Sequence, residues 1–98
     1  MSDSDRVRIE LPRVLADHAD GQRHLSIAFE PGDVVGSVLD RLGASYPLVG
    51  RRVCDETGSI RQFVNVYIDG EDVRRLAGRD TPVSPGQSVR IIQSVAGG

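Results

Sequence analysis

The sequence predicts an α+β fold in which one main helix packs on one face of a mixed sheet of four to five strands. Three observations lead to this fold class. Several short segments alternate apolar and polar residues, as half-buried strands do. Residues 34–42 instead space their apolar side chains with a helical period. Asp69-Gly70 follows the most β-prone segment and indicates a hairpin turn.

Residues 6–11 form the first expected strand, because apolar and charged side chains alternate there until Pro12 interrupts the pattern. Residues 24–29 alternate in the same way, with inward positions at Leu25, Ile27 and Phe29. The polar segment between them, residues 17–22, is expected to form a loop around Asp20-Gly21. The two strands are therefore predicted to be antiparallel neighbours.

The main helix is predicted to begin after a turn at residues 30–32, with Asp33 as its N-cap. Its apolar residues form one stripe, made of Val34, Val35, Val38, Leu39 and Leu42. Tyr46-Pro47 is expected to end the helix, since the residue before a proline disfavours the α region. A single apolar stripe can cover only one face of the sheet, so the other face stays open.

The second half of the chain supplies the remaining strands. Residues 63–68 are almost entirely β-branched or aromatic, which is typical of a strand. The hairpin turn returns the chain through a short strand at residues 71–73, and a polar connection leads to the last strand, residues 89–95. That strand is expected to pair centrally with the first one. Residues 48–60 are least regular, with one short helical turn expected at Leu48, Val49 and Val53.

The composition is that of one soluble domain, with 98 residues of which 39% are hydrophobic and 27% charged. A net charge of −2 argues against nucleic-acid binding, which needs a basic face. The first five residues lack the features of a signal peptide, and no apolar run is long enough to span a membrane, so we expect a cytoplasmic protein. All 12 basic residues are arginines, so the protein cannot acylate a lysine of its own.

The sequence offers no catalytic constellation and no metal site. Cys54 is the only cysteine, and His18 and His24 are expected in loops or at an edge, so neither a zinc site nor a triad is indicated. Glu71 and Asp72 are neighbours in a strand and therefore face opposite ways. The glycines fit neither nucleotide-binding pattern. We therefore expect a protein that is not an enzyme and binds no cofactor itself.

The last expected strand runs into Val-Ala-Gly-Gly at the end of the sequence. Glycine lacks a Cβ atom and is costly to order, so the final pair contributes nothing to a fold. Such a pair can, however, pass through a slot too narrow for side chains. We expect residues 1–94 to form the folded body and residues 95–98 a flexible tail that carries the Gly98 carboxylate into a partner's active site. The residues that would thread this slot are Val95, Ala96 and Gly97.

The alternation within each strand also assigns the two faces of the sheet. The predicted core comprises Val7, Ile9, Leu25, Ile27, Val38, Leu39, Leu42, Val64, Val66, Ile68, Val89 and Ile91. Phe63, Tyr67 and Ile92 then lie on the open face beside Arg90, close to the root of the tail. Because aromatic residues are enriched in interfaces, these four residues are predicted to form a docking patch for a partner.

Two stretches resemble the ubiquitin-like sulfur carriers of the MoaD/ThiS family. They are residues 63–74, FVNVYIDGEDVR, and residues 94–98, SVAGG. The first resembles most closely the CysO type of actinobacteria. The likeness covers essentially the whole chain and is least specific at residues 48–60. It implies the β-grasp, or ubiquitin-like, form of the predicted fold. Gln93-Ser94 stands where many members of the family have proline.

The resemblance implies a carrier that other proteins modify. A ThiF/MoeB-like adenylating enzyme would use ATP and magnesium to turn the Gly98 carboxylate into an acyl-adenylate. A persulfide or sulfide would then displace AMP and leave a thiocarboxylate, which passes its sulfur to an accepting synthase. The CysO-like stretch implies a cysteine synthase-like acceptor, with a JAMM-type metallopeptidase to release the product.

Several alternatives remain open at this point. Within the same class, the chain could be the small subunit of molybdopterin synthase, or a carrier for thiamine or for a sulfur-containing natural product. In a second class, a ubiquitin-like modifier would form an amide with a lysine of another protein. In a third, the chain would be an interaction module whose tail has no role.

Overall fold

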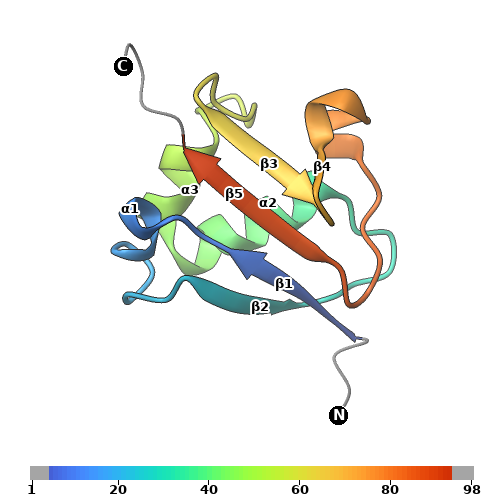
Figure 1. Cartoon of the computed structure of the whole chain (residues 1–98), viewed down its shortest axis with the longest axis horizontal. Coiled ribbons are helices and arrows are strands. Elements are labelled where there is room, and N and C mark those ends of the chain that lie inside the picture. Colours follow the sequence, from blue (N-terminus) through green and yellow to red (C-terminus); the bar gives the residue numbers. More distant parts are fainter. Residues whose placement is uncertain (1–4, 94–98) are drawn as a thin grey trace.

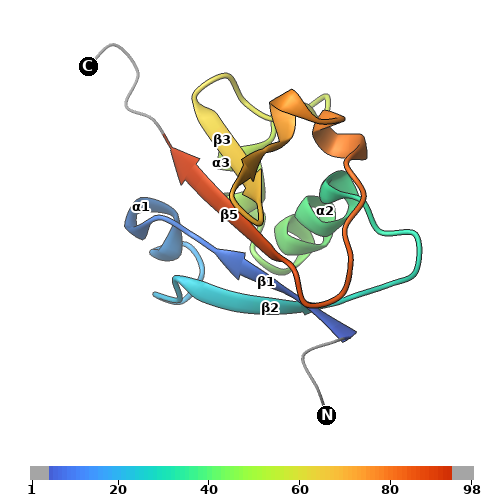
Figure 2. The ribbon, with the colours of Figure 1, turned by 45° about the vertical axis from the view of Figure 1, so that its right-hand side comes forward.

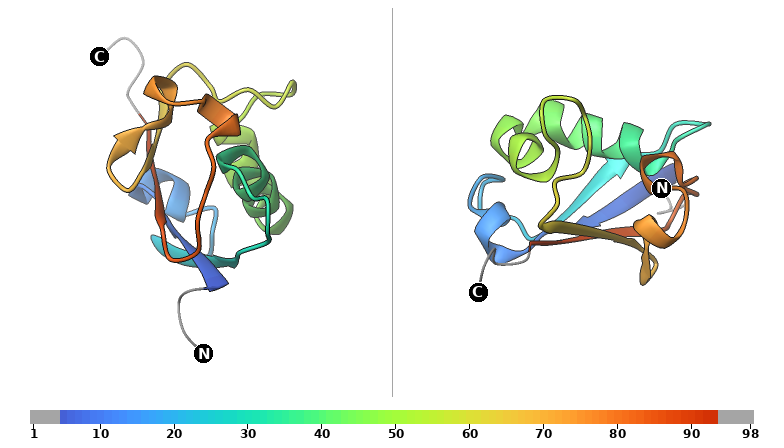
Figure 3. Two further views of the ribbon diagram at one scale, coloured as in Figure 1. Left: turned by 90° about the vertical axis from the view of Figure 1, so that its right-hand side faces the viewer. Right: turned by 90° about the horizontal axis from the view of Figure 1, so that it is seen from above.

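The computed structural model describes residues 5–93 and contains a five-stranded mixed sheet with helices packed on one face (Figure 1). The strands are β1 (Arg6–Glu10), β2 (His24–Ala28), β3 (Val64–Ile68), β4 (Glu71–Asp72) and β5 (Ser88–Gln93). The helices are α1 (Arg13–Ala16), α2 (Val35–Ser45) and α3 (Pro47–Val53), and two 3-10 turns, η2 (Val73–Arg75) and η3 (Gly78–Asp80), follow β4. In Figures 2 and 3, α2 and α3 form a layer on one side of the sheet. Residues 94–98, which include the predicted tail, lie outside the described residues.

The sheet order is β2-β1-β5-β3-β4, which places the last strand in the centre of the sheet. β5 runs parallel to β1 on one side and antiparallel to β3 on the other. β1 and β2 are antiparallel neighbours over their full lengths. The predictions of a central last strand and of an antiparallel first pair are confirmed. The last described residue, Gln93, pairs with Val64 of β3, whereas the pairing of β5 with β1 ends at Arg90.

The hydrophobic core lies between the sheet and the layer formed by α2 and α3. Ten of the twelve predicted core residues are buried, and the two exceptions, Leu25 and Ile27, are half-buried and pack against the core from the edge strand β2. Alternation in β1, β3 and β5 thus places one side of each strand under the helices. Burial of each aliphatic side chain contributes about 1.5–3 kcal/mol to folding. The core also includes residues that were not predicted, among them Leu11, Leu15, Val49, Val53 and Val73.

Two helices differ from the prediction. The segment after Pro12 forms α1, which buries Leu15 and Ala16 before the chain turns at Asp20 and Gly21, both with positive φ. α3 is longer than the single turn expected, because Pro47 ends α2 and also starts α3. Proline is well suited to the first turn of a helix, where no N–H is needed.

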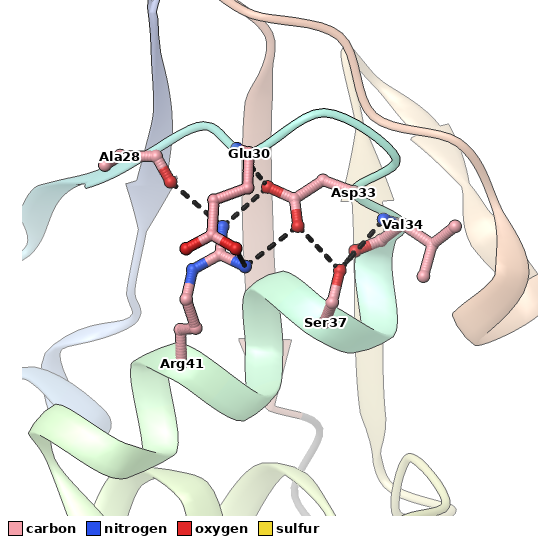
Figure 4. Close-up of polar contacts among 6 residues, drawn as sticks. All are labelled: Ala28, Glu30, Asp33, Val34, Ser37 and Arg41. Carbon is pink, nitrogen blue, oxygen red and sulfur yellow. Dashed lines mark hydrogen bonds and ion pairs between the residues drawn. The ribbon is translucent and has the colours of Figure 1, made fainter.

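Asp33 was predicted to be the N-cap of the main helix, and this was wrong. The N-cap is Val34, whose N–H donates to Ser37 Oγ. The Asp33 carboxylate is buried and accepts hydrogen bonds from the Glu30 N–H at 2.9 Å, from Ser37 Oγ at 2.8 Å and from both terminal nitrogens of Arg41 at 2.6 and 2.8 Å (Figure 4). The Arg41 guanidinium holds the pKa of Asp33 well below its usual range. The pair joins the loop after β2 to the second turn of α2.

The hairpin between β3 and β4 is confirmed. Asp69 and Gly70 have φ values of 46° and 88°, as a two-residue turn with two left-handed positions requires. β4 is short because Asp72 accepts a hydrogen bond from the Arg74 N–H at 2.9 Å and so starts η2. Within residues 5–93, none of the helices has the length and apolar character needed to cross a membrane.

Candidate docking surface and C-terminal site

The predicted site of covalent modification, Gly98, lies outside the described residues, as do Val95, Ala96 and Gly97. The structure does describe the strand that leads to them. In β5, Val89 and Ile91 are fully buried between β1 and β3. The last described residues, Ile91 to Gln93, continue this strand in pairing with β3.

The open face of the sheet carries a continuous row of polar residues at the level of Arg90. The strand registers pair His24 with Glu10, Glu10 with Arg90, Arg90 with Tyr67, and Tyr67 with Asp72. The row therefore crosses all five strands. Arg90 is exposed, and its Nε atom lies 3.8 Å from Glu10 Oε2.

Three of the four residues of the docking patch lie on neighbouring strands of this face. Tyr67 pairs with Arg90, and in the next row Asn65 pairs with Ile92. Tyr67 and Ile92 are half-buried, so each presents part of its side chain to solvent.

Phe63, the fourth residue of the patch, lies outside the strand in which it was predicted. β3 begins at Val64, and Phe63 belongs to the turn before it. Phe63 is 46% exposed, which is high for a residue of this size. Since Val64 pairs with Gln93, Phe63 lies close to the point where β5 ends.

Arg74 is a residue of this surface that the sequence did not reveal. Its Nη1 atom donates to Asn65 Oδ1 at 2.8 Å, and its Nη2 atom donates to the Arg61 carbonyl at 2.9 Å. These bonds hold η2 against the start of β3. No periodic pattern could have placed Arg74, because it lies in a 3-10 turn. By contrast, the alternation in residues 6–11 does place Arg8 and Glu10 on the open face.

The open face is basic although the whole chain is slightly acidic. Arg6, Arg8, Arg74 and Arg90 are exposed on or beside it, whereas the acidic residues on or beside it are Glu10, the half-buried Asp72 and the exposed Asp69, which is hydrogen-bonded to Ser88. A surface of this kind favours a partner with a complementary acidic surface.

The remaining candidate groups form no catalytic arrangement within the described part of the chain. Cys54 is half-buried, and its sulfur accepts a hydrogen bond from Arg79 Nη1 at 3.5 Å. Burial raises the pKa of the Cys54 thiol, although the charge of Arg79 acts in the opposite direction. A protonated thiol is a weak nucleophile. His18 lies in the turn after α1, His24 lies on the open face of β2, and residues 5–93 hold no cluster of three or more potential metal ligands.

Known proteins are similar to this chain over most of its length. Residues 14–98 match the ThiS family. The chain is 37% identical over 94 residues to the sulfur carrier protein CysO of Mycobacterium tuberculosis, covering 94% of this chain and 98% of that protein. The crystal structure of CysO from that organism superposes with a TM-score of 0.80 at 35% identity, covering 91% of this chain and 99% of the other.

Two further relatives are informative. Small archaeal modifier protein 3 of Haloferax volcanii is 35% identical over 79 residues, covering 80% of this chain and 84% of that protein. A chain from the crystal structure of the Amycolatopsis orientalis BexX/CysO complex has a TM-score of 0.80 at 28% identity, covering 94% of this chain and 99% of the other. The sheet with its covering helices is thus the ubiquitin-like β-grasp fold. With a family match from residue 14 to residue 98 and relatives that align along almost their whole length, the chain belongs to the ThiS family.

Proposed function

We propose that this protein is a sulfur carrier that is charged at the carboxylate of Gly98. The observation that carries the proposal is the identity of 37% to a sulfur carrier protein across 94% of the chain, together with a family match that includes the Gly97-Gly98 pair. In this proposal the chain is a protein substrate and carrier, not an enzyme.

The chemistry begins with activation, because a carboxylate is a poor electrophile until it carries a good leaving group. A ThiF/MoeB-like adenylating enzyme would bind ATP and magnesium. A Gly98 carboxylate oxygen would attack the α-phosphorus of ATP, and pyrophosphate would leave. Sulfide would then attack the carbonyl carbon and expel AMP, which leaves a thiocarboxylate. If the donor is a persulfide, a second thiol must reduce the resulting acyl disulfide.

The fold supports this chemistry because Gln93, the last described residue, is held in the sheet by pairing with Val64 of β3. Five extended residues reach at most about 17 Å beyond Gln93. That distance would allow Gly98 to enter a partner's active site while the sheet remains outside. Val95, Ala96 and Gly97 would thread through the slot, and the terminal glycine pair, which lacks side chains, is the sequence feature that supports this.

Docking of the carrier on the adenylating enzyme would use the docking patch, Phe63, Tyr67, Ile92 and Arg90. Exposed apolar atoms beside an arginine are a composition enriched in protein interfaces. The basic open face adds a preference for an acidic partner surface. That a related CysO was solved in a complex with BexX supports protein docking as the working mode of this body.

The sulfur would be used in biosynthesis, and cysteine is the product we propose, since CysO proteins are among the relatives with the highest identity. The acceptor would then be a cysteine synthase-like enzyme, and a JAMM-type metallopeptidase would release the product from the carrier. Molybdopterin, thiamine and sulfur-containing natural products are alternative destinations of the same thiocarboxylate.

A second candidate function is protein modification. The observation that favours it is the identity of 35% to a small archaeal modifier protein. A modifier would pass the same activated Gly98 carbonyl to a lysine amine of another protein. The two functions share the adenylation step and differ in the nucleophile that follows.

Intact mass spectrometry distinguishes these functions. The protein is incubated with its adenylating enzyme, ATP, magnesium and sulfide, beside a variant that lacks Gly98. We expect a mass gain equal to the exchange of one oxygen for sulfur in the full chain and none in the variant. Conjugates with other proteins in the native host, without any thiocarboxylate, would support the modifier instead. If the full chain keeps its mass both in this reaction and in the native host, both functions are contradicted.

A further inference from the structure

The strand β2 forms one edge of the sheet, since among residues 5–93 it pairs with β1 and with no strand on its other side. Its sequence, HLSIA, carries no charge when histidine is neutral. An edge strand of this kind presents unpaired main-chain groups and is a template for pairing with another strand. The opposite edge, β4, has only two residues and offers little to pair with.

The hydrogen bonds that flank the β1–β2 ladder define which groups of β2 point outward. The Leu11 N–H donates to the Arg23 carbonyl at one end, and the Phe29 N–H donates to the Asp5 carbonyl at the other. Hydrogen-bonded and non-hydrogen-bonded pairs alternate in an antiparallel ladder. Leu25 and Ile27 therefore direct their main-chain groups toward β1, and His24, Ser26 and Ala28 direct theirs away from the sheet.

Two of the carbonyl groups of β2 that point away from the sheet accept hydrogen bonds from arginine guanidinium groups. Arg6, from the open face, donates from Nη2 to the Ser26 carbonyl at 3.1 Å and from Nε to Ser26 Oγ at 2.8 Å. Arg41, from α2 on the other side of the sheet, donates from Nη2 to the Ala28 carbonyl at 2.9 Å (Figure 4). Asp33 holds Arg41 in this position. The edge is thus capped from both faces by arginines anchored within the same chain.

The strand that would compete with these arginines is β2 of a second copy. Ser26 is the middle residue of β2, so two antiparallel copies centred on it would pair Ser26 with Ser26 and His24 with Ala28. Most of the hydrogen bonds between the two strands would be accepted by the carbonyls of Ser26 and Ala28. Those are the carbonyls that Arg6 and Arg41 already occupy.

We propose that Arg6 and Arg41, the edge-capping arginines, prevent β2 from pairing with β2 of a second copy of this chain and so keep the protein monomeric. A second copy can pair only after the guanidinium groups have left the carbonyls. Hydrogen bonds from charged donors are about twice as strong as neutral ones, so neutral N–H donors of a second strand do not fully replace them. The proposal does not depend on the sulfur-carrier function.

The test compares Arg6→Ala with Arg8→Ala. Arg8 is exposed on the same strand and loses the same charge, but its guanidinium contacts the Gly86 carbonyl instead of β2. Sedimentation equilibrium up to millimolar protein gives the dimer dissociation constant. Amide hydrogen exchange at His24, Ser26 and Ala28 reports whether the edge is paired. Arg6→Gln, which keeps most of the side chain, serves if Arg6→Ala does not fold.

We expect the native protein and Arg8→Ala to remain monomeric with unprotected outward amides. Arg6→Ala should dimerise with a dissociation constant at least about tenfold lower, because a charge-assisted cap is removed from each copy. In Arg6→Ala, protection of the Ser26 amide should rise as the protein concentration rises. If Arg6→Ala is as monomeric as Arg8→Ala, or if it dimerises without protection of Ser26, the proposal is wrong. A native protein that already pairs through β2 would also overturn it.

Discussion

Truncation of the docking patch should weaken binding to the adenylating enzyme while leaving the fold intact. The change is Phe63→Ala combined with Ile92→Ala. A phenylalanine side chain buries roughly 150–250 Å² in a tight contact. Since Phe63 is 46% exposed in the free protein, docking could bury about 90 Å² more. At about 25 cal/mol per Å² this gives about 2 kcal/mol. Loss of this term alone raises the dissociation constant about thirtyfold.

The assay is isothermal titration calorimetry against the ThiF/MoeB-like adenylating enzyme, with circular dichroism to measure the folded fraction. Leu48→Ala is the matched control, because Leu48 is 49% exposed on α3, on the helix side of the sheet. We expect the double variant to bind at least tenfold more weakly and Leu48→Ala to bind like the native protein. A double variant that is folded and binds within twofold of native would refute the docking patch. Equal losses from the double variant and from Leu48→Ala would do so too.

Three predictions concern the fold. Arg41→Met leaves the buried Asp33 carboxylate without its guanidinium partner, so the free energy of unfolding in urea should fall by about 3 kcal/mol. The control is Arg52→Met, a change at an exposed arginine, which should lower it by less than about 0.5 kcal/mol. Because the pKa of Asp33 is lower in the folded than in the unfolded protein, its stabilisation is present above about pH 4 and is lost as the pH falls further. The free energy of unfolding should therefore fall less steeply between about pH 4 and 2 in Asp33→Asn than in the native protein, and an unchanged slope would contradict this. A Cβ atom added at Gly50 would lie 2.8 Å from Gly43 Cα, whereas one added at Gly43 would lie 3.2 Å from Gly50 Cα. Gly50→Ala should therefore lower the melting temperature more than Gly43→Ala.

The sheet was predictable from the sequence because its pattern is local. Alternation in β1, β3 and β5 places one side of each strand in the core, and the Asp69-Gly70 pair defines the hairpin. α1 was not predictable in the same way, since four residues are too few to show a helical period. The role of Asp33 was misassigned because capping rules consider only the nearest residues. Its main partner, Arg41, lies eight residues further on.

The candidate site was predictable to different degrees. Tyr67, Ile92 and Arg90 were placed on the open face by the period of two along each strand, and the structure places them on neighbouring strands. Phe63 was assigned to β3 but lies in the turn before it. Arg74 reaches Asn65 across a hairpin and a 3-10 turn, so its contribution depends on tertiary structure alone. The role of Gly98 stays a prediction.

The most direct test of the sulfur-carrier function is to locate the sulfur within the chain. The protein is purified from its native host under conditions that preserve thiocarboxylates, and its C-terminal peptide is sequenced by tandem mass spectrometry. We predict a fragment series that is unmodified through Gly97 and carries one oxygen-to-sulfur exchange at Gly98, abolished when the adenylating enzyme is deleted. Sulfur found on Cys54 instead, or a Gly98 carboxylate that remains unmodified while the adenylating enzyme is active, would contradict the proposed function.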